Sequence, residues 1–214
     1  MKKCFLYCAG EYCDGYVTPT AEDIVVAVDA GYETLKNLCI KPSLAVGDFD
    51  SLGFLPEDVE VIRHPSVKDD TDTVLAARYM LERGISQFYI FGAFGKRLDH
   101  SIANIQLMGN MAKKGAVVFA FDEGYTYTAI HNASLSFDKN YEGTVSAFAI
   151  GDSVKNVSMT GLKYTLCNAE IFCDNPIGVS NEFIGENASI SVGDGILLVM
   201  FERKSALELP CVSN

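Results

Sequence analysis

The first half of the chain alternates apolar runs with amphipathic segments, and this order most constrains its fold. The apolar runs are CFLYCAG, IVVAVDAG, SLAVGD, VEVIRHP, QFYIFGAF and AVVFAFD. Apolar spacing predicts helices over 32–38, 70–82 and 101–114, and Gly84 and Gly115 follow the last two as C-terminal caps. Nearly continuous apolar strands between helices are typical of a parallel sheet covered on both faces. The sequence therefore predicts an α/β, Rossmann-like N-terminal domain with a parallel sheet.

The pattern changes at about residue 123. Short β-rich segments such as YTAIHNASLSF and GTVSAFAI follow, separated by Asn, Asp and Gly, and no convincing helix occurs among them. Such a series indicates an all-β sandwich or barrel. We therefore expect two closely packed domains, 1–122 and 123–214, without a flexible linker.

The charge balance excludes some partners. There are 17 Lys and Arg against 28 Asp and Glu, a net charge of −11. Nucleic-acid binding needs clustered basic residues, so we expect no nucleic-acid partner. No stretch approaches the length of a membrane span, and the first apolar run is too short for a signal peptide. The seven scattered cysteines indicate reduced thiols, and we expect a soluble cytoplasmic protein.

Aspartates follow several of the predicted strands. They are Asp29, Asp48, Asp50, Asp69, Asp72 and Asp99. The carboxyl ends of parallel strands meet at one edge of a sheet, where ligands bind, so these acids are expected to converge. Converging carboxylates repel one another unless cations lie between them. Mg²⁺ prefers such hard oxygen ligands and is the expected metal.

Each acid also has a structural interpretation. Asp69 and Asp72 fit the N-cap and N3 positions of a helix, and Asp99 could cap the next one. Asp29 could be a turn residue. If the backbone around Asp48 and Asp50 stays extended, both side chains project to the same side, which a turn does not require.

The segment FGAFGKRLDH is a glycine-containing loop between a strand and a helix. Backbone amides near Gly92 and Gly95, together with Arg97, suit phosphate oxygens. The spacing is not that of a Walker A loop. His100 either orients a neighbouring group or is an ordinary residue of the first helical turn.

The segments VDAG, VGDFDSL, DDTD, GKRLDHSIANI, TGLKYTL and GVSNEF resemble the thiamin pyrophosphokinase family, in the family's order and over nearly the whole chain. The resemblance implies transfer of the pyrophosphoryl group of ATP to the hydroxyethyl oxygen of thiamin, giving thiamin diphosphate and AMP. It implies an ATP- and Mg²⁺-binding N-terminal domain and a β-sandwich that helps to bind thiamin. It also implies a homodimer with each active site between subunits.

The resemblance assigns roles to the acids of the N-terminal half. Asp48, Asp50 and Asp72 would bind magnesium and phosphate, and Asp29 and Asp99 would complete the site. Asp72 is the expected acceptor of the hydroxyl proton.

Further roles follow by the same resemblance. Arg97 would contact phosphates, with Asp69 and His100 on the ATP side. Ser180 and Asn181 would face the thiamin pyrimidine, although a β-turn also explains them. Tyr164 would line the thiamin side, where some relatives carry tryptophan.

Other functions fit parts of the pattern. A pyrophosphokinase acting on a pterin alcohol would use the same acids with a different acceptor. A non-catalytic acidic module that binds metal or carbohydrate would explain only the β-rich half. A nucleotidase would form AMP without an acceptor.

Overall fold

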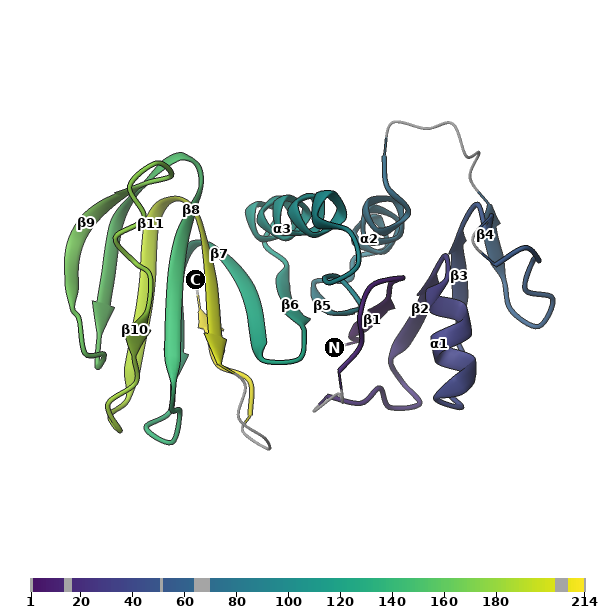
Figure 1. The fold of residues 1–214 in the computed structure, drawn as a ribbon, viewed down its shortest axis with the longest axis horizontal. Coiled ribbons are helices and arrows are strands. Elements are labelled where there is room, and N and C mark those ends of the chain that lie inside the picture. Colours follow the sequence, from purple (N-terminus) through teal and green to yellow (C-terminus); the bar gives the residue numbers. More distant parts are fainter. Residues whose placement is uncertain (1, 14–16, 51, 64–69, 203–207, 214) are drawn as a thin grey trace. The chain divides into compact units, whose positions relative to one another are not determined.

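The computed structural model describes residues 2–13, 17–50, 52–63, 70–202 and 208–213 (Figure 1). Contacts divide the chain into two units. The first comprises Met1–Leu107 and Ala120–Glu123, and the second comprises Met108–Phe119 and Gly124–Asn214. Residues 108–119 thus group with the second unit, whereas the predicted division is a single cut after residue 122. One reason is Gly109, which lies so close to Ile150 that an added Cβ would be 3.2 Å from its Cδ1 atom.

The strands of the first unit pair in parallel. They are β1 (Cys4–Tyr7), β2 (Ile24–Val28), β3 (Leu44–Gly47), β4 (Val61–Arg63) and β5 (Gln87–Phe91). Their order is β5-β1-β2-β3-β4. The chain proceeds from β1 to one side as far as β4 and then returns to the other side at β5. Their carboxyl ends therefore meet at one edge, with a topological switch point between β1 and β5.

Aromatic side chains form much of the core of this unit. All four residues of β1 are buried, which is why the run is continuously apolar. The ring of Phe5 stacks on that of Tyr89 with centroids 4.8 Å apart. Phe91 continues the stack to Phe121 at 4.9 Å, at the end of β6 (Val117–Phe121). These contacts fix β5 against its neighbours.

The predicted helices are confirmed with shifted ends. They are α1 (Gly31–Asn37), α2 (Asp72–Glu82) and α3 (Leu98–Lys113). The N-cap of α2 is Thr71, whose Oγ1 accepts a hydrogen bond from the Val74 amide at 3.3 Å. Asp72 is therefore the first helical residue, and placing it at N3 behind an Asp69 cap was wrong. Gly84 and Gly115 have φ values of 80° and 81°, which only glycine adopts readily.

The second unit is β-rich, as predicted. Its strands after β6 are β7 (Tyr125–Phe137), β8 (Thr144–Thr160), β9 (Leu166–Phe172), β10 (Asn181–Glu182), β11 (Ala188–Glu202) and β12 (Cys211–Ser213). The antiparallel order is β10-β8-β11-β7, with β9 on β8 and β12 on β7. The strands β8 and β11 are long, and a register shift between Asp194 and Ile196 interrupts the ladder between them. Such irregularities bend a strand, so both halves of β8 contribute to one core, with Ala147 from the first and Val157 from the second.

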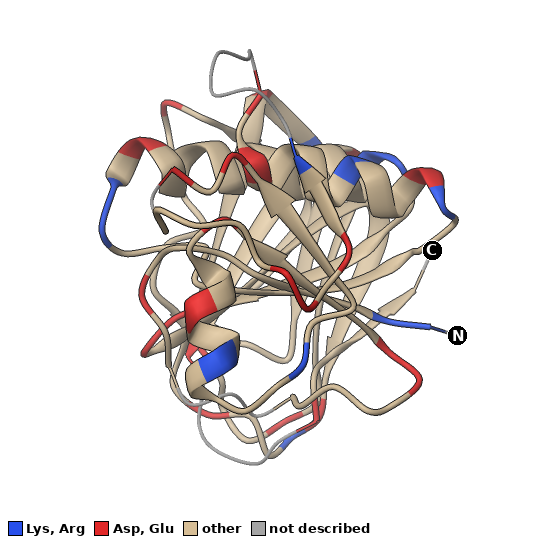
Figure 2. Ribbon diagram, turned by 90° about the vertical axis from the view of Figure 1, so that its right-hand side faces the viewer, with Lys and Arg blue, Asp and Glu red and all other residues tan. Residues whose placement is uncertain are grey.

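Charged residues stand mainly on helices and in loops, and the strands carry few of them (Figure 2). None of the helices that the structure describes combines the length and the apolar character that a membrane-spanning helix needs.

A substitution at Gly31 tests the packing of α1 against β1. A Cβ atom at this position would lie 1.8 Å from the Tyr7 carbonyl oxygen, which is backbone and cannot rotate away. We expect Gly31→Ala to lower the free energy of unfolding by about 3 kcal/mol, the upper end of typical overpacking costs. Urea unfolding followed by circular dichroism measures the change. Gly124→Ala, where an added Cβ meets nothing within 4 Å, is the matched control. Equal stability of the two variants would contradict this packing.

Candidate active site

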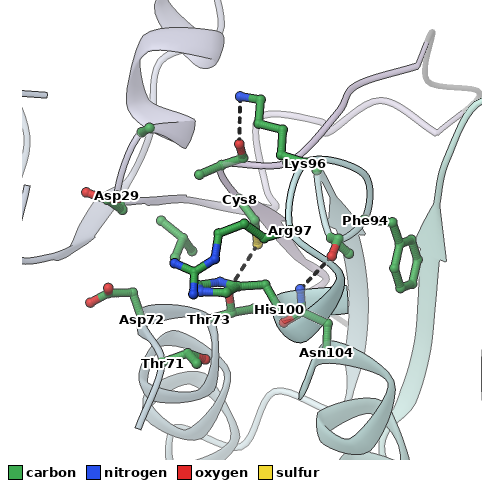
Figure 3. Close-up of a pocket in the computed structure, with 16 residues that line it drawn as sticks. Cys8, Asp29, Thr71, Asp72, Thr73, Phe94, Lys96, Arg97, His100 and Asn104 are labelled. Atoms are coloured by element: carbon green, nitrogen blue, oxygen red, sulfur yellow. Dashed lines mark hydrogen bonds between the residues drawn. The ribbon is translucent and has the colours of Figure 1, made fainter. Parts of the chain in front are cut away.

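A cavity of about 320 Å³ lies at the switch point of the first unit (Figure 3). Its walls are residues 8–10 after β1, residues 29 and 30 after β2, and residues 71–73 at the start of α2. The loop after β5 and the side chains of His100 and Asn104 from α3 complete them. The cavity is therefore assembled from five separate parts of the chain, all belonging to one unit.

Backbone hydrogen bonds hold two of these walls together. The amide of Gly10 donates to the Gly92 carbonyl at 2.9 Å, and the amide of Glu11 donates to the Phe94 carbonyl at 2.8 Å. A Cβ atom on Gly10 would lie 2.3 Å from the Phe94 oxygen, so only glycine fits. The segment after β1 and the loop after β5 thus form one framework around the cavity.

Buried polar groups line the cavity behind its charged residues. Thr73 Oγ1 lies 3.6 Å from Cys8 Sγ as a hydrogen-bond donor. Burial raises the pKa of the Cys8 thiol to about 12, so the thiol stays neutral at physiological pH. The Nδ2 group of Asn104 donates to the Ala93 carbonyl at 2.6 Å and fixes the loop from below. Sequence reasoning missed these three side chains because their apolar surroundings are typical of core residues.

Two of the predicted acids line this cavity. Asp29 follows β2 directly, with φ 48°, and its amide donates to the Val46 carbonyl at 2.9 Å. Asp72 begins α2. Their side chains lie on the same side of the cavity as the guanidinium group of Arg97 (Figure 3). The structure thus brings carboxylates and a cation from three connections into one place.

The cations of the loop after β5 are themselves held in place. Lys96 Nζ donates to the Ala9 carbonyl at 3.0 Å. Arg97 contacts Asp99 through two bonds, Nε to Oδ1 at 3.1 Å and Nη2 to Oδ2 at 2.6 Å. The hydrogen bond from Arg97 holds the pKa of the Asp99 carboxyl below its ordinary value, and the same contact raises the pKa of Arg97. Asp99 does not line the cavity, and in this structure it accepts hydrogen bonds from Arg97 and from the His100 amide.

The acids after β3 are arranged differently from the extended geometry considered above. Phe49 is buried and has φ 61°, so the backbone turns between Asp48 and Asp50. Asp48 Oδ1 accepts a hydrogen bond from the Asp50 amide at 3.1 Å, which is an Asx turn. Neither acid lines the cavity.

The predicted metal ligands Asp48, Asp50 and Asp72 are not gathered in this conformation. The described residues contain no group of three Asp, Glu, His or Cys side chains that could hold a metal ion. This three-acid set therefore stays a prediction. Asp69 lies outside the described residues.

The candidate residues of the second unit lie near one another. Asn181 begins β10, Ser180 precedes it with φ 56°, and Tyr164 lies in the connection between β8 and β9. Ser180 donates its amide to Ser146 Oγ at 3.0 Å. The Tyr164 side chain is exposed, whereas Asn181 is buried and hydrogen-bonded to the backbone of Tyr164.

Comparison with known families matches both halves of the chain. Residues 19–120 match the model described as Thiamin pyrophosphokinase, catalytic domain, and residues 132–197 match the model of the vitamin B1 binding domain of the same enzyme. The chain belongs to the thiamin pyrophosphokinase family. The resemblance stated from the motifs is thereby confirmed, and the chain is a transferase of the kinase class.

Individual relatives agree with this assignment. A thiamine pyrophosphokinase of Bacillus subtilis is 29% identical over 182 residues, which cover 82% of this chain and 85% of the relative. The crystal structure of thiamine pyrophosphokinase from Bacillus subtilis superposes with a TM-score of 0.81 at 26% identity, covering 96% of this chain and 100% of that one. A family protein from Enterococcus faecalis gives 0.80 at 28% identity, with coverages of 96% and 100%. Sequence and fold therefore point to the same family.

The contact between Arg97 and Asp99 can be tested directly. In Arg97→Gln we expect the Asp99 pKa to rise toward its ordinary value, because the hydrogen bond that stabilises the carboxylate is lost. Carboxyl-carbon NMR titration measures this pKa. Lys163→Gln removes a cation paired with Glu182 and should leave the Asp99 pKa unchanged. An unchanged Asp99 pKa in Arg97→Gln would show that the pair does not persist in solution.

Proposed function

We propose that the chain catalyses the Mg²⁺-dependent transfer of the pyrophosphoryl group of ATP to the hydroxyethyl oxygen of thiamin, with AMP as the second product. One observation carries the proposal. The cavity at the switch point of a parallel sheet combines the carboxylates of Asp29 and Asp72 with the cationic side chains of Lys96 and Arg97. Family models of a thiamin pyrophosphokinase catalytic domain and of its vitamin B1 binding domain match the two halves of the same chain.

The residues of this cavity fit magnesium bound together with phosphates. Mg²⁺ at kinase sites is held by one or two carboxylates plus substrate phosphates and water, not by an all-protein cage. Asp29 and Asp72 supply two carboxylates at one cavity. When bound, Mg²⁺ offsets the negative charge on the phosphate oxygens during transfer. Asp48 and Asp50 stand after β3, the strand next to β2, and we include them among the groups that approach the phosphates.

The protein's own groups position the donor. Arg97 retains free N–H directions beside its contact with Asp99 and binds phosphate oxygens. The α2 N-terminus adds the positive end of a helix dipole beside Asp72. Asp72 accepts the proton of the attacking hydroxyl, and His100 contributes from α3 on the ATP side. The hydroxyl attacks the β-phosphorus and AMP leaves, so positioning and charge stabilisation supply most of the rate.

The acceptor site uses the second unit. Exposed side chains near β10 include Tyr164, Ile177, Val179 and Ile184, a mixed aromatic and apolar surface suited to a heterocycle or to another subunit. We propose that thiamin binds against Tyr164 and Ser180, with the first unit of one protomer and the second unit of its partner forming each site of a homodimer. A cytoplasmic location goes with this proposal because ATP is the donor. We also include in this proposal the description of the first unit as Rossmann-like, since the donor would bind at the edge of a parallel sheet.

Product analysis tests the reaction. After incubation with thiamin, ATP and Mg²⁺, we expect AMP and thiamin diphosphate in equal amounts, resolved by chromatography. ADP with thiamin monophosphate would mean attack at the γ-phosphorus and would contradict the mechanism. AMP without thiamin would indicate a nucleotidase, and product with a pterin alcohol alone would reassign the acceptor.

Substitution of the cavity acids tests their roles. We expect Asp72→Asn and Asp29→Asn to lower kcat/KM by about 100-fold or more, because an amide neither accepts the proton nor neutralises a cation. Asp70→Asn is the matched control, since Asp70 pairs with Arg78 at 2.9 Å and does not line the cavity.

Asp50→Asn tests whether the acids of the loop after β3 act together with the cavity acids Asp29 and Asp72. A loss as large as in Asp72→Asn means that the loop after β3 joins the site, and near-normal turnover removes Asp50 from it.

A further inference from the structure

The side-chain amide of Asn181 is fully engaged inside the protein. Only 4% of this residue is exposed. Its Oδ1 accepts hydrogen bonds from the amides of Tyr164 and Glu182, both at 2.9 Å. Its Nδ2 donates to the Tyr164 carbonyl at 2.6 Å and lies 3.9 Å from the sulfur of Met159. A carboxamide has two acceptor positions and two donors, so all four are in use.

Two of these bonds clamp the backbone of a single residue. Asn181 binds both the N–H and the C=O of Tyr164, in the way that a neighbouring strand would. The adjacent Lys163 is held as well, because its amide donates to the Glu182 carbonyl at 3.0 Å and its Nζ pairs with Glu182 Oε1 at 2.7 Å. The connection that carries Tyr164 is thus fixed to β10 residue by residue.

The clamp holds the backbone of a residue whose side chain faces solvent. Tyr164 as a residue is 60% exposed, and Lys163 Nζ lies 5.6 Å from its ring centroid. A tyrosine on a free loop loses conformational entropy when it binds a ligand, whereas one on a fixed backbone loses less. Because the buried Asn181 side chain fixes the backbone of the exposed Tyr164, the Tyr164 ring is well placed to bind a ligand.

We propose that Asn181 is a positioning residue for the acceptor, which acts through Tyr164 and does not contact the acceptor itself. The inference rests on the proposed function for the identity of the acceptor. It differs from direct recognition of the pyrimidine by the Asn181 amide, because an amide whose four positions are already used has none for a ligand. The flat, partly cationic acceptor then meets the ring of Tyr164.

Amide hydrogen exchange of the unmodified protein tests the clamp without any assay of activity. The Tyr164 amide should exchange about 100-fold more slowly than an unprotected amide, although its side chain is exposed. In Asn181→Ala, which removes the oxygen that accepts the hydrogen bond from the Tyr164 amide, this protection should fall by about 10-fold or more. Fast exchange of the Tyr164 amide in the unmodified protein would overturn the proposal, whatever the reaction catalysed.

A double-mutant cycle tests the route through Tyr164. Asn181→Asp should raise KM for thiamin about 10-fold and leave KM for ATP within about twofold. In a Tyr164→Ala background, the same substitution should change KM for thiamin by less than about twofold. Independent effects of the two substitutions would mean that Asn181 contacts thiamin directly and would overturn the proposal.

A matched amide controls for general damage to the second unit. Asn187→Asp changes a side chain whose Oδ1 accepts from the Lys139 amide at 2.9 Å, and it should leave both KM values unchanged. If the protein shows no thiamin turnover at all, the proposed function fails. The exchange of the Tyr164 amide still decides whether the clamp exists.

Discussion

The parallel pairing of β1 with β2 on one side and β5 on the other is the constraint on which the candidate site depends. Because these strands run in the same direction, the chain must leave each of them at the same edge. Asp29 follows β2 and Arg97 follows β5, so opposite charges that are far apart in sequence reach one cavity. No local feature of either segment could bring them together.

Close packing then makes the edge rigid. The segment after β1 approaches the loop after β5 so closely that Gly10 has no room for a Cβ atom, and Gly31 meets the Tyr7 carbonyl in the same way. The loop after β3 is fixed by other means. Phe49 is buried at its start, and Tyr32 donates to Asp58 Oδ1 at 2.5 Å near its end, a bond that raises the Tyr32 pKa and lowers the Asp58 pKa. The loop that carries these acids is thus held by an aromatic anchor and a tyrosine.

The sequence predicts the order of strands and helices well because burial on both faces leaves continuous apolar runs, as in β1. The predicted gathering of acids at one edge is met only in part, since Asp29 and Asp72 line the cavity and Asp48, Asp50 and Asp99 do not. The sequence does not predict that Thr71 caps α2, because threonine and aspartate are both good caps. The sequence also does not predict the left-handed backbone conformation of Phe49, because burial of its ring compensates for an unfavourable φ. The burial of Asn181 is not predictable either, because the segment GVSNE is typical of an exposed turn. Only the structure shows the four partners of its side-chain amide.

The contact between Arg97 and Asp99 bears on how the proposed phosphate binding is compatible with an acidic site. A guanidinium group has five N–H donors, and Asp99 takes one from Nε and one from Nη2. The remaining N–H groups point away from Asp99. The carboxylate therefore fixes the plane of the guanidinium group but does not use all of its donors. Both side chains are largely solvent-exposed, where solvent screening keeps the energy of an ion pair small. In the proposed reaction, a phosphate can therefore add to the pair at little cost, with Asp99 orienting the arginine.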